Sequence, residues 1–131
     1  MPFARISLIK GKSPEYVRAV ADSVHNAMVA AFNVPVDDRF QLIHQHAPDE
    51  MIFDRHYYTD NRSEDFVLIH ITIGKPRSTA TKKATYKKIV ELLQISPGIR
   101  PEDVMIVISK SQLDEWSFSM GIAQMALDDE S

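Results

Sequence analysis

The sequence predicts one α+β domain in which a four-stranded mixed sheet carries two helices on one face. Four segments have the alternating or continuous apolar composition of β-strands. Two segments between them repeat apolar residues at three- and four-residue steps, which is the pattern of an amphipathic helix. The order strand–helix–strand occurs twice at nearly equal length: Gly11 to Phe40 spans 29 positions and Gly74 to Val104 spans 30.

The first strand is predicted over about residues 3–9, where apolar and polar side chains alternate. Ser13 is a good N-cap and Pro14 suits the first helical position, so a helix begins there. Asn33 and Pro35 end this helix. Its inward face is an apolar stripe made of Val17, Val20, Ala21, Val24, Ala27, Met28, Ala31 and Phe32.

The second strand is expected at about residues 39–46, followed by a polar loop to Asp65. The third strand, 66–73, is nearly continuously apolar and β-branched, which predicts a strand covered on both faces. Ser78 or Thr79 can cap a second helix that runs to about Leu93. The residues of that helix expected to face inward are Tyr86, Ile89, Val90 and Leu93.

A Ser-Pro-Gly turn leads to a last strand from Val104 to Ser109, and the tail is expected to hold a short hairpin or turn. We therefore predict one domain over residues 1–131, with βαβ units at about 2–46 and 66–109 and a C-terminal tail at 110–131. The alternative is a plain ferredoxin-like domain without duplication.

Right-handed crossovers place both helices on one face of the sheet, which leaves the other face uncovered. The strands carry apolar residues on both faces, notably over residues 66–73. Self-association is the simplest way to cover that second face. The sequence therefore predicts an oligomer.

Composition restricts the function classes. The chain has 131 residues, a formal net charge of −3 and no cysteine, which argues against broad attraction to nucleic acid and excludes disulfides and thiolate catalysis. The N-terminal region lacks the apolar core of a signal peptide, and no segment has the roughly 20 apolar residues that cross a bilayer. We expect a cytoplasmic protein without a membrane partner.

Pro2 is the first candidate for chemistry. A small second residue permits removal of the initiator Met1, and this would leave a free secondary amine. An α-amino group titrates at about 7.7–8.0, so it can transfer a proton near neutral pH or attack a carbonyl. A proline that merely opens a strand is the structural alternative, and retention of Met1 would leave Pro2 as an unreactive amide.

Two cations follow the third strand, Lys75 and Arg77, where a helix is about to begin. They could converge on one anion, and the planar guanidinium matches a carboxylate. Solvated loop charges are the alternative. Asp38, before the second strand, could position a water, orient a substrate or tune the Pro2 amine; as a turn former it would sit beside Arg39, a surface ion-pair partner.

The remaining motifs give weaker indications of function. His44 and His46 share a strand face, but no third ligand at suitable spacing accompanies them, so no metal site is predicted. His25 is placed off the helix stripe, and His70 is interpreted as a core histidine. Trp116 and Phe118 could line an apolar pocket or fill a subunit interface. Ser109 and Ser111 lack a nucleophile elbow.

Together these features resemble the tautomerase superfamily, and within it the malonate semialdehyde decarboxylases. The resembling stretches cover almost the whole chain: 33–41, Gln45-His46 with Pro48 and Glu50-Met51, the Lys75-Pro-Arg-Ser78 turn, and Trp116-Ser-Phe118 followed by Gly121.

The resemblance implies a cofactor-free and metal-free homotrimer that acts on a small oxo- or enol-carboxylate. It makes Pro2 the catalytic amine, Asp38 the carboxylate that activates water or orients the substrate, and Arg77 the carboxylate binder. Trp116 and Phe118 would form the apolar wall. In two places the chain departs from the decarboxylase pattern: Lys75 stands where an arginine is expected, and Met125 replaces a later aromatic wall residue.

Three classes of function stay open at this point. Decarboxylation of a 3-oxo acid uses cationic Pro2 to polarise the carbonyl, or forms an iminium. Keto–enol tautomerisation, or hydration of unsaturated oxo acids, uses Pro2 as a proton carrier. A non-catalytic trimeric interaction protein would keep the fold without the chemistry.

Overall fold

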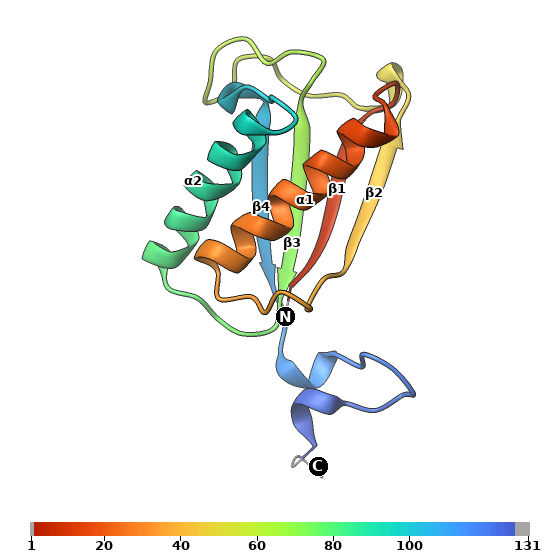
Figure 1. The fold of residues 1–131 in the computed structure, drawn as a ribbon, viewed down its shortest axis with the longest axis vertical. Helices are drawn as coiled ribbons and strands as arrows, with labels where there is room; N and C mark the ends of the chain where they lie inside the picture. Colours follow the sequence, from red (N-terminus) through yellow and green to blue (C-terminus); the bar gives the residue numbers. More distant parts are fainter. Residues whose placement is uncertain (1, 128–131) are drawn as a thin grey trace.

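The computed structural model describes residues 2–127 and contains a four-stranded sheet in the order β2-β1-β3-β4 (Figure 1). The central pair, β1 and β3, is antiparallel, and each outer strand is parallel to its neighbour. This is the mixed sheet that the sequence predicts. The bounds of the strands are Pro2–Ile9 for β1, Gln41–His46 for β2, Val67–Ile73 for β3 and Val104–Lys110 for β4.

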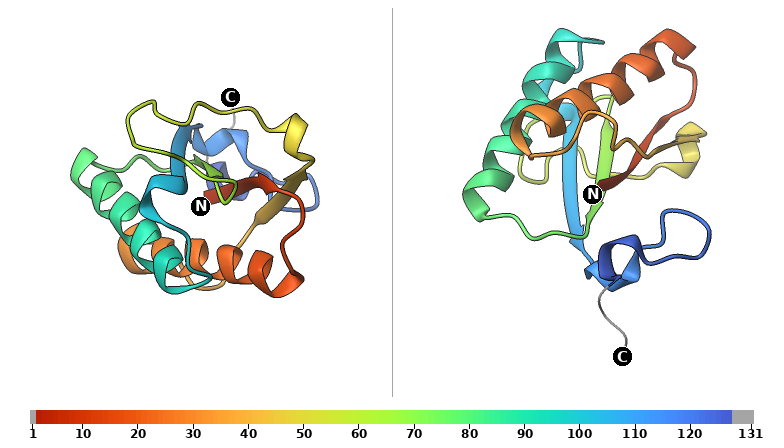
Figure 2. Two further views of the ribbon diagram at one scale, coloured as in Figure 1. Left: turned by 90° about the horizontal axis from the view of Figure 1, so that it is seen from above. Right: turned by 60° about the horizontal axis from the view of Figure 1, so that its bottom comes forward.

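Both helices lie on the same face of the sheet, as predicted, and pack against each other (Figure 2). Helix α1 spans Pro14–Ala31 and α2 spans Thr79–Ile95. Each begins with a serine cap: the Ser13 hydroxyl oxygen accepts the Tyr16 N–H at 3.1 Å, and the Ser78 hydroxyl oxygen accepts the Thr81 N–H at 3.1 Å. Within residues 2–127, no helix is long and apolar enough to cross a membrane.

The core lies between the helices and the inner face of the sheet, and two helical positions differ from the sequence prediction. His25 is only 3 % exposed, because it stands four residues after Ala21 and three before Met28 and so belongs to the apolar stripe. In α2, Thr85 is fully buried and Tyr86 half-buried. The Thr85 hydroxyl donates to the Thr81 carbonyl at 2.8 Å, which satisfies it inside the core.

The opposite face of the sheet has no helix over it (Figure 2). Alternate residues of β3 are buried beneath the helices, whereas Leu68, His70 and Thr72 are half-buried on the other side. The prediction that β3 is covered on both faces is therefore not met within this chain. His70 lies on this open face, where its Nε2 is 2.7 Å from the Ser109 hydroxyl, and not in the core. Met105 is 43 % exposed there.

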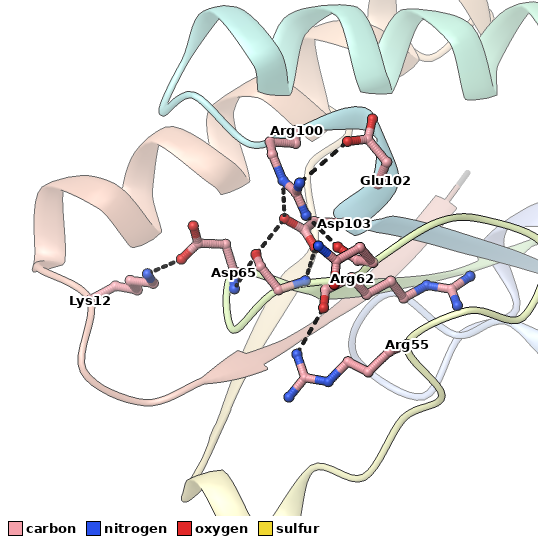
Figure 3. A network of polar contacts seen from close by, with 9 residues as sticks. Lys12, Arg55, Arg62, Asp65, Arg100, Glu102 and Asp103 are labelled. Atoms are coloured by element: carbon pink, nitrogen blue, oxygen red, sulfur yellow. Dashed lines mark hydrogen bonds and ion pairs between the residues drawn. The ribbon is translucent and has the colours of Figure 1, made fainter.

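A long loop between β2 and β3 crosses the end of the sheet opposite to the N-terminus (Figure 1). The fully buried carboxylate of Asp103 fixes this loop (Figure 3). It accepts both the backbone N–H and the hydroxyl of Ser63 at 2.6 Å, and the Arg100 Nε at 3.2 Å. Arg100 also donates to the Asn61 carbonyl at 2.7 Å. The network ties the loop to the turn that precedes β4.

We expect Asp103→Asn to lower the free energy of unfolding by about 2–4 kcal/mol, because the neutral amide cannot accept all of these bonds. Burial opposes the charge, but the bonds from Ser63 and Arg100 outweigh burial and lower the pKa of Asp103 below 3.8. This contribution is present above the ordinary aspartate pKa and is lost as the pH falls through the lower, folded value. Urea unfolding at pH 7 and pH 3 measures both effects. Glu102→Gln, on the same turn but half-buried and paired with Arg100 only at 3.5 Å, should change stability by less than about 1 kcal/mol.

Candidate active site

The topology collects the predicted site residues at one end of the sheet. Strands β1 and β2 begin at this end, and β3 and β4 finish there. Pro2 opens β1 and Asp38 precedes β2, while Lys75 follows β3 and Trp116 follows β4. In Figure 1 this is the lower end of the sheet, next to the N-terminus. Residues up to 114 positions apart in the chain are thereby brought to one edge.

Pro2 is the first residue of β1 and is buried. It lies opposite Ile73, the last residue of β3, and Ile73 lies opposite Lys110, the last residue of β4. Residues directly opposite one another on neighbouring strands point to the same face of a sheet. Pro2, Ile73 and Lys110 therefore form one row across the end of the sheet. Met1, whose removal the predicted chemistry requires, lies outside the described residues.

Several contacts hold the segment that carries Asp38, and three of them show how it is placed. The Asp38 N–H donates to the Pro35 carbonyl at 3.0 Å in a tight turn. The buried His25 bonds the Val36 carbonyl through Nε2 at 2.9 Å, so this nitrogen is the protonated donor. Arg39 contacts Asp22 of α1 at 2.6 Å, which confirms its role as an ion-pair partner. The hydrogen bond from Arg39 lowers the pKa of Asp22. The Asp38 segment is thus anchored on α1.

Arg77 is half-buried and uses two of its nitrogens to bind backbone. Its Nε donates to the Phe32 carbonyl at 3.1 Å, and its Nη1 donates to the Lys75 carbonyl at 2.7 Å. The guanidinium also lies over the Phe32 ring, 4.7 Å from its centroid, in a cation–π contact. Arg77 therefore joins the end of α1 to the loop after β3. Its Nη2 makes no hydrogen bond within residues 2–127.

A cationic hollow of about 400 Å³ lies at the end of β3 and β4. Its lining includes Ile73, Lys75, Pro76, Lys110, Ser111 and Glu115. Ile73 is buried and supplies an apolar floor, while both lysines are exposed. The combination of two ammonium groups with an apolar floor suits a small organic anion.

An aromatic hollow of about 330 Å³ lies nearby and is lined by Phe3, Phe40, Trp116 and Phe118, among others. The rings of Trp116 and Phe118 stack at a centroid distance of 5.6 Å. Trp116 and Phe118, the two rings predicted to form an apolar wall, therefore lie against each other. Met125, the other expected wall position, is half-buried but lines neither hollow.

Ser111 connects the two hollows. Its hydroxyl donates to the Ile73 carbonyl at 2.9 Å and accepts the Trp116 Nε1–H at 2.7 Å. Its backbone N–H also donates to the Ile73 carbonyl, at 2.8 Å. Ser111 therefore fixes the Trp116 indole relative to the end of β3. This is a structural role, and it does not require the nucleophile motif that Ser111 lacks.

Beyond Trp116, the chain forms a compact arm that extends away from the sheet (Figure 1). A bridge between Ser119 and Ile122 closes a two-residue turn, in which Met120 and Gly121 have φ values of 59° and 69°. Asparagine or glycine is favoured where φ is positive, and Gly121 meets that need. The predicted hairpin or turn in the tail is present. Met120, at its tip, is 89 % exposed.

Comparison with known proteins identifies the family. A family model described as "Tautomerase enzyme" matches residues 38–119, and a second model of that description matches residues 2–61. The chain is 37% identical over 125 residues to the probable tautomerase YusQ of Bacillus subtilis, covering 95% of this chain and 98% of the relative. The chain belongs to the tautomerase family.

Solved structures of the tautomerase family agree with the fold. A malonate semialdehyde decarboxylase is 32% identical with a TM-score of 0.90, and the match covers 96% of this chain and 97% of that one. A second one, FG41 malonate semialdehyde decarboxylase inhibited by 3-bromopropiolate, is 34% identical with a TM-score of 0.89, covering 96% and 95%. A symmetric trimer of fused 4-OT, at 16% identity and a TM-score of 0.77, has the same fold.

The sequence prediction did not include Lys110 or the link between Ser111 and Trp116. The fourth strand was predicted to end at Ser109, and the structure extends it by one residue. That residue is what places Lys110 in register with Ile73. The length of β3 could have indicated that β4 reaches Lys110, because both strands have seven residues.

Proposed function

We propose that this tautomerase-family enzyme uses the amine of Pro2, freed by loss of Met1, to decarboxylate a small 3-oxo acid. The observation that carries the proposal is the row at the end of the sheet, where Pro2 lies beside residues of a cationic hollow. The two decarboxylase structures, each more than 30% identical over nearly the full chain, support the reaction class.

In the proposed mechanism, the substrate carboxylate binds at the cationic end and the 3-oxo group lies next to the Pro2 nitrogen. In its cationic form the amine polarises the carbonyl oxygen. In its neutral form it instead attacks the carbonyl and, with one added proton, gives an iminium with loss of one water. The bond between the carboxylate carbon and the α-carbon breaks, and its electron pair moves into the polarised carbonyl or iminium. Carbon dioxide leaves, a proton returns to the α-carbon, and water releases any iminium. Each 3-oxo acid gives one carbon dioxide and one carbonyl product.

The other site residues have supporting roles in this mechanism. Asp38 orients the substrate or activates the water that releases the product, and Arg77 offers Nη2 to the substrate while it holds the Lys75 loop in place. Trp116 and Phe118 cover the reacting carbon and exclude water from it.

Keto–enol tautomerisation is the second candidate, because the curated relatives at 37% and 33% identity are both named probable tautomerases. The same Pro2 amine would then act in its neutral form, taking a proton from one atom of the substrate and returning it to another. Tautomerisation and decarboxylation by polarisation therefore require opposite protonation states of Pro2 at neutral pH.

A homotrimer is part of the proposal. The apolar side chains on the open sheet face and the exposed Met120 at the tip of the arm need cover, and a second copy of the chain supplies it. The fused 4-OT relative is a symmetric trimer. Light scattering should give about three times the chain mass of 14.9 kDa, and a monomer would contradict this.

The decisive assay uses untagged protein whose intact mass shows that Met1 is absent. With a 3-oxo acid such as malonate semialdehyde, we expect one carbon dioxide per substrate consumed. With an enol acid, we expect slower interconversion to the oxo form. Rapid enol–oxo interconversion without carbon dioxide release would favour the tautomerase. If the protein catalysed neither reaction, this result would contradict an enzymatic site.

A further inference from the structure

Lys110 occupies a position from which it can act on the same substrate. It ends β4 and lies in the row that contains Ile73 and Pro2. Neighbouring strands are about 4.8 Å apart, so the backbones of Lys110 and Pro2 are separated by roughly 10 Å. The flexible four-carbon stem of a lysine can cover much of that distance.

The two ammonium groups of the cationic hollow have no partner within residues 2–127. Neither Lys75 nor Lys110 makes an ion pair or a side-chain hydrogen bond there, whereas Lys12 pairs with Asp65 and Lys88 with Glu91. Like charges in one hollow repel each other unless an anion lies between them. The hollow therefore favours an anionic ligand over a cationic one.

One carboxylate, that of Glu115, also borders the hollow, and it already has a backbone donor. It accepts the Gln112 N–H at 2.8 Å in the reciprocal cap of the 3₁₀ turn Leu113–Glu115. Two cations and one anion leave a net positive charge in the hollow. Arg77 directs two of its donors to backbone carbonyls, so it cannot present a complete fork there.

We propose that Lys110 and Lys75 together bind the substrate carboxylate. Lys110 is then a specificity-determining residue, because Lys75 alone does not suffice to bind the carboxylate. This rests on the proposed function, because the carboxylate is that of the 3-oxo acid whose carbonyl meets Pro2. Binding between the lysines holds the carboxylate at the end of the row, with the rest of the substrate directed along Ile73 toward Pro2.

The test measures anion binding separately from turnover. The probe is 3-hydroxypropanoate, which has a carboxylate but no carbonyl, and 1,3-propanediol is its neutral counterpart. Titration by calorimetry or NMR compares wild type with Lys110→Met, which removes the charge, and with Lys110→Arg, which keeps it. Lys10→Met is the matched control, because Lys10 is an exposed lysine at the opposite end of the same sheet.

We expect Lys110→Met to weaken 3-hydroxypropanoate binding, and to lower kcat/KM for the 3-oxo acid, by about 10-fold or more, as expected for loss of one charged hydrogen bond. Lys110→Arg should stay within about threefold of wild type, and Lys10→Met should have no effect. Diol affinity should be the same in all variants.

Several results would overturn the role of Lys110: wild type that does not bind the anion, Lys110→Met that binds it as well as wild type, or an equal loss in Lys10→Met. Failure of the proposed reaction looks different. In that case the anion still binds in a Lys110-dependent manner, but no turnover depends on Pro2.

Discussion

An alanine inserted between Met1 and Pro2 should lower kcat/KM for the 3-oxo acid by roughly 10²–10⁴-fold, the range expected for loss of a proton-transfer or covalent catalyst. After removal of Met1, the inserted alanine carries the terminal amine and the Pro2 nitrogen becomes an amide. An amide nitrogen can neither be protonated at neutral pH nor form an iminium. The proline ring, its strand and its partner Ile73 remain in place. Steady-state kinetics on protein of verified intact mass measures the loss.

Pro2→Ala is the companion variant, because it keeps a terminal amine but loses the ring that fixes the direction of the nitrogen. Its activity should fall between wild type and the insertion. Light scattering and thermal unfolding must match wild type in both variants. If the insertion turns over substrate as fast as wild type, the Pro2 amine has no role in the reaction.

The fold could be predicted because local signals and topology agree. The serine caps, the apolar stripes and the repeated strand–helix–strand order each specify the same elements, and right-handed crossover then leaves one arrangement of the helices. His25 escaped prediction for a different reason. Its spacing from Ala21 and Met28 places it in the apolar stripe, but the burial of a polar ring there depends on the Val36 carbonyl, which lies in the turn after α1.

The sequence indicated which residues gather at one end of the sheet, but not the contacts between them. Pro2, Lys75 and Trp116 could be assigned to one edge because strand order brings strand ends together. The presence of Lys110 in the cationic hollow could not be predicted without the exact register of β3 and β4. A shift of one residue would turn Lys110 to the other face of the sheet. Ser111 needed three-dimensional geometry, because its importance lies in two hydrogen bonds to residues from separate segments.

Arg77 contributes both to the site and to the stability of the fold, so its replacement should lower both activity and stability. We expect Arg77→Met to lower kcat/KM by about 10²-fold, because it removes the Nη2 donor from the substrate and frees the loop that presents Lys75. It should also lower the free energy of unfolding by about 1–3 kcal/mol, since the Phe32 and Lys75 carbonyls lose their donor and the Phe32 ring loses its cation.

Arg77→Lys separates the two roles. A lysine keeps the charge near the substrate, but its single ammonium cannot bridge two carbonyls and stack on a ring at once. If the guanidinium acts mainly as a clamp, Arg77→Lys should be as destabilised as Arg77→Met in urea unfolding and should recover little activity. If it acts mainly as a charge, Arg77→Lys should recover most of kcat/KM. We expect the first result, because two of the donors of Arg77 already bind backbone. Recovery of more than about half of the wild-type kcat/KM would contradict it.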